Sequence, residues 1–141
     1  MDLLKLLKDR NAGCVKITFA KNYNYDLERV MARVGLPKGP SELRKVSNEE
    51  AIDTMTAILW RDMAYRVELI DKEQAYQRAL MFVGEYALAD AEFYNNLFWF
   101  TDYALPGRFD SFSAVSDSTF TMCLLIVNPD SAVCVLAEDE D

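Results

Sequence analysis

The chain has 141 residues, of which 51% are apolar and 27% are charged, and its formal net charge is −8. This length and apolar content predict one folded domain, residues 1–141, rather than a disordered chain, and no stretch reaches the ~18 uncharged apolar residues of a membrane-spanning helix. The acidic balance disfavours direct binding of nucleic acid or of anionic membranes, and without a signal-peptide pattern at the start we expect a cytoplasmic protein.

The first third of the chain predicts a helix, a strand and a second helix. Leucines near residues 3–7 begin a short helix, and the alternation of apolar and polar residues in CVKITFA predicts a strand over 14–20. An amphipathic helix is predicted over 25–34, before the turn-forming segment GLPKGPS. Its apolar stripe consists of Leu27, Val30, Met31 and Val34.

The middle of the chain predicts two further helices with a strand between them. Ser47 and Glu50 form a capping box, in which hydroxyl and carboxylate satisfy backbone donors at the start of a helix. Alternation in AYRVELI predicts a strand over 64–70, and a second capping pattern at Asp71 begins a helix over about 72–88. The stripe of the first helix consists of Ile52, Met55, Ile58 and Leu59.

The last third is dominated by a predicted hairpin. Residues 89–104 fit either a helix or a pair of bulky strands, because their periodicity is weak. Two strands, over 119–128 and 131–138, then flank the segment NPDS, where Pro129 suits the second position of a type I turn.

A symmetric turn fixes the register of this hairpin. Cys123 then lies opposite Leu136, and Cys134 opposite Leu125, so the two thiols become diagonal neighbours on one face. Two packed thiols are expected there, and a regulatory disulfide is the alternative. Both faces of the hairpin are apolar, so either helices cover both or one face meets another subunit.

These elements predict an α+β fold: a small, mainly antiparallel sheet with about four or five packed helices. The two earlier strands carry polar residues on one side and are expected at the edges of the sheet. Residues 136–141 end in EDED and are expected to form a solvated acidic tail rather than a metal site.

The residue types that most enzymes use are missing or scattered. The chain has no histidine, and its three cysteines form no C-x-x-C pair. Ser-His-Asp and Cys-His catalysis are therefore excluded, and no phosphate-binding glycine motif occurs. We expect no catalysis, no metal ion and no other cofactor. An enzyme or small-ligand binder with an aromatic-lined pocket is an alternative.

The acidic charge is concentrated in the second part of the chain. Residues 85–141 contain 11 Asp/Glu and one base, Arg108, and the segment 93–112 contains eight aromatic rings. Aromatic anchors among carboxylates are typical of an interface with a basic protein, and a buried aromatic cluster is the alternative. The candidate partner-binding residues are Asp90, Glu92, Tyr94, Trp99, Asp102, Tyr103 and Asp110.

The segments AEFYNNLFWFTD and SDSTFTMCLLIV…AVCVLAEDED give the last third of the chain a resemblance to a class of proteins. In their acids, aromatics and hairpin they resemble the immunity proteins of bacterial toxins that are delivered by contact-dependent or type VI secretion. The resemblance implies a non-catalytic inhibitor that covers the active site of a cognate basic toxin domain, such as a nuclease. The alternatives are a charge mimic that regulates a nucleic-acid-binding protein, and a homodimer whose aromatic faces meet.

Overall fold

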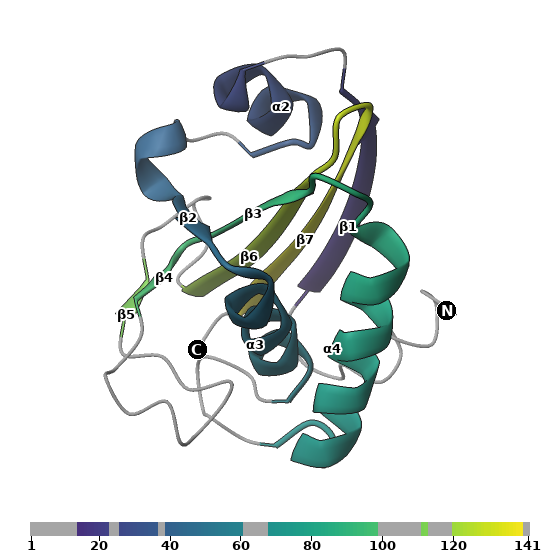
Figure 1. Cartoon of the computed structure of the whole chain (residues 1–141). Helices are drawn as coiled ribbons and strands as arrows, with labels where there is room; N and C mark the ends of the chain where they lie inside the picture. Colours follow the sequence, from purple (N-terminus) through teal and green to yellow (C-terminus); the bar gives the residue numbers. More distant parts are fainter. Residues whose placement is uncertain are drawn as a thin grey trace.

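The computed structural model of this chain describes residues 14–22, 26–36, 39–60, 68–98, 111–112 and 120–139. They form an α+β fold around a five-stranded sheet in which all neighbouring strands are antiparallel (Figure 1), so the predicted class is confirmed. In spatial order the strands are β1 (Cys14–Lys21), β7 (Ser131–Asp139), β6 (Phe120–Val127), β3 (Glu92–Asn95) and β2 (Arg44–Val46). A separate two-stranded ladder joins β4 (Leu97–Phe98) to β5 (Ser111–Phe112).

The described residues contain three α-helices, where the sequence predicts four or five. They are α2 (Leu27–Arg33), α3 (Asn48–Trp60) and α4 (Lys72–Tyr86), and a short 3-10 turn, η1 (Pro40–Glu42), precedes β2. Helices α3 and α4 pack side by side over one face of the sheet, and α2 covers the other face (Figure 1). The helix predicted near residues 3–7 lies outside the described part of the chain.

Side-chain caps begin the helices where the sequence predicts them. The backbone N–H of Glu50 donates to Ser47 Oγ at 3.1 Å, and the Ser47 N–H donates to Glu50 Oε1 at 3.3 Å. Asp71 accepts from the N–H groups of Glu73 and Gln74 at the start of α4. Both capping patterns are therefore confirmed, and they fix the first turns of α3 and α4.

The hairpin of β6 and β7 has the predicted register. Cys123 lies opposite Leu136 and Leu125 opposite Cys134, and the two sulfur atoms are 3.7 Å apart. Both apolar faces of the hairpin are covered within the chain, because α3 and α4 bury one face and α2 buries the other. The face under α3 and α4 consists of Met122, Leu124, Ile126, Val133 and Val135.

Of the two alternatives for residues 89–104, the structure shows strands, at 92–95 and 97–98, and Phe93 and Asn95 alternate into the layer under α3. Two predictions about the sheet need correction. Residues 136–139 are not part of a solvated tail, since they complete β7 between β1 and β6. Of the strand predicted over 64–70, residues 68–70 lie outside the five-stranded sheet, and 61–67 lie outside the described residues.

Candidate functional site

Two of the candidate partner-binding residues, Glu92 and Tyr94, lie on the same side of β3. Alternation along the strand places their side chains on the face that α2 covers, and Tyr94 packs against the edge of that apolar cluster. Lys45 lies directly opposite Tyr94 on the edge strand β2. The sheet thus brings an aromatic ring, a carboxylate and an ammonium group together at one edge, and we call these three residues the β3 cluster.

The β3 cluster is held together by short polar contacts. Tyr94 Oη donates to Glu92 Oε2 at 2.8 Å, and Lys45 Nζ lies 3.3 Å from Glu92 Oε1. The hydrogen bond from Tyr94, followed by that from Lys45, lowers the pKa of the Glu92 carboxyl. Burial, followed by the hydrogen bond to Glu92, raises the pKa of Tyr94 to about 12. The cluster therefore presents a neutral phenol and an ionised carboxylate over a wide pH range.

Asp90 lies two residues before Glu92 in the turn that leads from α4 into β3. The turn is closed by a hydrogen bond from Ala91 N–H to the Leu88 carbonyl at 3.2 Å, and Asp90 has a φ of 66°. Aspartate tolerates this left-handed conformation better than most residues do. The Asp90 side chain is exposed, so its carboxylate is available to solvent near the start of β3.

The other four candidates fall outside the described part of the chain. Trp99, Asp102, Tyr103 and Asp110 belong to the segment 99–110. The structure therefore places three of the seven predicted residues and brings two of them, Glu92 and Tyr94, into direct contact.

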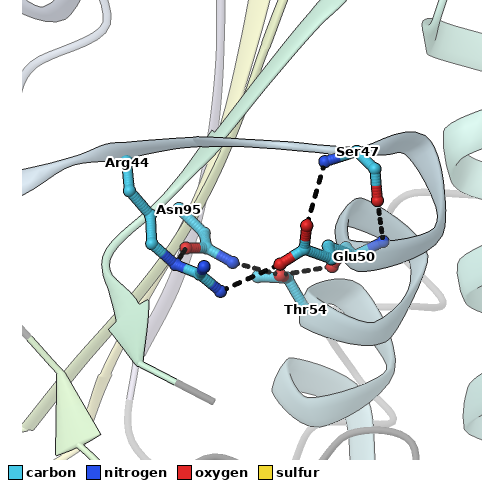
Figure 2. A network of polar contacts seen from close by, with 5 residues as sticks. All are labelled: Arg44, Ser47, Glu50, Thr54 and Asn95. Carbon is cyan, nitrogen blue, oxygen red and sulfur yellow. Dashed lines mark hydrogen bonds and ion pairs between the residues drawn. The ribbon is translucent and has the colours of Figure 1, made fainter. Parts of the chain in front are cut away.

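A polar network fixes the position of β2 and so of Lys45. Figure 2 shows that Arg44 reaches from β2 to the Asn95 side chain of β3, with Nε 3.1 Å from Oδ1. Its Nη2 atom lies 3.1 Å from Glu50 Oε2 of α3. Asn95 in turn donates to the Thr54 hydroxyl at 2.8 Å, and both side chains are fully buried. The network ties the edge of the sheet to α3, and the sequence pattern does not reveal it.

Other buried amides have structural partners. The Asn96 side chain donates to the Thr121 carbonyl and accepts from the Cys123 N–H, both at 2.8 Å. It thereby continues the β3–β6 pairing where the backbone leaves the sheet toward β4. Asn128 donates to the Tyr86 carbonyl and accepts from the Leu88 N–H, which joins the β6–β7 turn to the end of α4. These amides are used to hold the fold.

The described residues are strongly acidic. They include 15 Asp/Glu and 8 Lys/Arg, and beyond residue 84 they include six acids and no base. The six are Glu85, Asp90, Glu92, Asp130, Glu138 and Asp139. Glu138 forms an ion pair with Lys16 of β1 at 3.0 Å, so the acids near the end of β7 are partly used within the sheet.

The sequence pattern does not predict that the apolar residues Phe19 and Leu88 are exposed. Phe19 and Leu88 are each 52% exposed, although the alternation in β1 predicts an inward-facing Phe19. Phe19 is exposed because β1 is an edge strand. The last apolar side chain in a row that crosses the sheet has no further strand beside it to cover it.

No group of three or more acidic or cysteine side chains suited to a metal ion occurs among the described residues. In the same part of the chain, no helix is both long and apolar enough to cross a membrane. Comparison of the whole chain with protein-family models, curated proteins and solved structures finds no match.

Proposed function

We propose that this chain is a non-catalytic inhibitory protein of the immunity type, which binds a cognate basic toxin domain in the cytoplasm of a bacterium. The observation that carries the proposal is the β3 cluster, where Tyr94 and Glu92 are in contact on β3, next to the edge strand β2 and two residues after Asp90. Glu92 and Tyr94 of this cluster belong to the part of the chain beyond residue 84, in which the described residues carry six acids and no base.

The geometry of the β3 cluster suits recognition of a cationic protein. The Tyr94 ring is half-buried and its hydroxyl is fixed by Glu92, so little side-chain entropy is lost when a partner covers it. The Glu92 carboxylate has further acceptor sites for a lysine or arginine beyond those used by Tyr94 and Lys45. Asp90 adds a second carboxylate that steers the encounter with a basic surface.

Inhibition then follows from coverage of the toxin rather than from turnover. A basic active site attracts the acidic face at long range, and the aromatic contacts retain it once water has been displaced. The complex contains one copy of each protein, and the chain leaves it unchanged. In this proposal Trp99, Asp102, Tyr103 and Asp110 also take part in binding the toxin.

The test uses the C-terminal domain encoded by the gene next to that of this chain. Size-exclusion chromatography with light scattering should give a one-to-one complex, and co-expression of the chain should rescue growth of cells that produce the domain. The double variant Asp90→Asn, Glu92→Gln should weaken both effects, while Glu73→Gln, an exposed acid in the first turn of α4, should not. Absence of a complex, or equal activity of the double variant, contradicts the proposal.

A further inference from the structure

A row of side chains crosses all five strands on the face that α3 and α4 cover, and it ends at an exposed ring. The register pairs Phe19 with Val133, Val133 with Ile126, and Ile126 with Phe93, which pairs with Val46. Every member from Val46 to Val133 is buried, whereas Phe19 on the edge strand β1 is 52% exposed. A sixth strand beside β1 would extend the row and cover this ring.

The ring of Phe19 belongs to a small apolar surface. It lies 5.4 Å from the Tyr86 ring at the end of α4, and Tyr86 lies 4.8 Å from the buried Phe82 ring. Leu88, two residues after Tyr86, is 52% exposed. Figure 1 shows the end of α4 beside β1, and we call Phe19, Tyr86 and Leu88 the edge cluster.

Three exposed carboxylates border the edge cluster. Glu85 adjoins Tyr86 and, after burial, contributes to raising the pKa of that phenol. Asp90 belongs to the turn that Leu88 begins, and the Asp130 carbonyl accepts from the Asn22 N–H at the end of β1. Lys21 is the one basic residue that the described chain places at this end of β1.

We propose that the edge cluster and β1 form a docking surface for an extended, cationic segment of a partner protein, which adds to the sheet as a strand. Strand addition to an exposed edge gives affinity through the main chain and specificity through alternate side chains. In the proposed complex an apolar side chain of the added segment covers Phe19. Lysine or arginine residues of the same segment pair with Glu85, Asp90 and Asp130. The inference rests on the proposed function only in taking the partner to be cationic. It concerns the β1 edge of the sheet, whereas the β3 cluster lies near the β2 edge.

Charge argues against a second copy of this chain as the occupant. If two β1 strands paired in antiparallel fashion, the Lys21 end of one would meet the Cys14 end of the other, where Glu138 of β7 lies. Glu138 is itself paired with Lys16 at this end, so the repulsion comes mainly from the net charge of −8 that each molecule carries. Such like-charge contact is unfavourable.

The experiment titrates ¹⁵N-labelled protein with the peptide KKVTVTVTVKK and follows amide shifts and hydrogen exchange by NMR. Saturable shifts and slowed exchange are expected along β1 and in Phe19, Tyr86 and Leu88. The peptide EEVTVTVTVEE and the proline-interrupted KKVTPTVTVKK should bind much more weakly. Phe19→Ala should raise the dissociation constant about tenfold, while Met81→Ala, a residue 60% exposed on α4, should leave it unchanged.

Three results would overturn the inference. The first is that the chemical shifts of the β1 amides do not change at saturating peptide, and the second is that the acidic peptide binds with equal affinity. The third is a concentration-dependent dimer in which the β1 amides are protected from hydrogen exchange without peptide. The peptide assay does not use the toxin domain, so its outcome is separate from that of the complex. Peptide binding at β1 without a toxin complex would contradict only the proposed function.

Discussion

The Sγ atoms of Cys123 and Cys134 lie 3.7 Å apart on diagonal positions of the β6–β7 hairpin, beneath α2. Both side chains are buried, with exposures of 0% and 1%. The hydrogen bond with Cys134, followed by burial, raises the pKa of the Cys123 thiol well above its ordinary value. Because the thiolate is the reactive form, the Cys123 thiol is expected to be inert in the folded protein, and burial keeps reagents from Cys134.

The thiol pair can be tested in a Cys14→Ser background. At about pH 8 the native protein should react with a disulfide reagent many-fold more slowly than the unfolded chain, in which both remaining thiols react promptly. The reaction is followed by absorbance with and without guanidinium. Rapid modification of both thiols in the native protein would contradict the burial described for them.

We expect the buried Asn96 to be one of the polar residues whose substitution destabilises the protein most. Asn96→Ala leaves the Thr121 carbonyl and the Cys123 N–H without their side-chain partner, so the free energy of unfolding should fall by about 2–4 kcal/mol. Urea unfolding measures the change. Asn48→Ala, at an exposed position in the first turn of α3, should cost less than about 0.5 kcal/mol. Similar losses in both variants would contradict the role assigned to Asn96.

Two buried threonines of α3 provide a matched comparison. The Thr54 hydroxyl donates to the Glu50 carbonyl and also accepts from Asn95, whereas the Thr56 hydroxyl donates to the Ile52 carbonyl. Thr54→Val leaves a buried amide of Asn95 without its acceptor and should cost about 1–3 kcal/mol. Thr56→Val should cost less than about 1 kcal/mol, because its carbonyl partner keeps its helical bond. Equal costs in thermal or urea unfolding would contradict the network in Figure 2.

The contact between Tyr94 and Glu92 predicts a dependence of stability on alkaline pH. Tyr94 has a pKa of about 12 in the folded protein against 10.0 for an ordinary tyrosine. The unfolded state therefore loses its proton first, and the contribution of Tyr94 is complete below pH 10 and lost as the pH rises toward 12. Over that interval the free energy of unfolding should fall more steeply for the wild type than for Tyr94→Phe. Parallel curves would contradict the raised pKa.

The sequence predicts those parts of the fold that depend on residues close together in the chain, such as helix caps and turns. The capping residues Ser47 and Asp71 begin α3 and α4, and the turn at Pro129 fixes the register that places Cys123 beside Cys134. The apolar alternation of the hairpin also predicts two covered faces. Each of these features depends on residues that are close in the sequence or on one strand pair.

The remaining features depend on partners that are distant in the sequence. Strand β2 has only three residues, and the Arg44 contacts with Asn95 and Glu50 hold it against β3 and α3. Asn96 acts through a carbonyl and an N–H of β6, some 25 residues away. The polar alternation of 14–20 correctly predicts that β1 is an edge strand, but the contact of the Phe19 ring with Tyr86 at the end of α4 joins residues far apart in the sequence, which no short pattern encodes. The same limit explains why the edge cluster was not among the predicted site residues.

The most direct test of the account measures how fast the chain associates with the neighbouring gene's toxin domain as ionic strength rises. Stopped-flow fluorescence between about 0.05 and 0.5 M salt should show a rate constant that falls steeply for the wild type. The Asp90→Asn, Glu92→Gln variant keeps the left-handed turn and one of the two acceptor oxygens of residue 92. Its rate constant at low salt should be smaller than that of the wild type and should fall less steeply as salt is added. A rate that is independent of salt, or identical for the two proteins, would contradict recognition through these carboxylates.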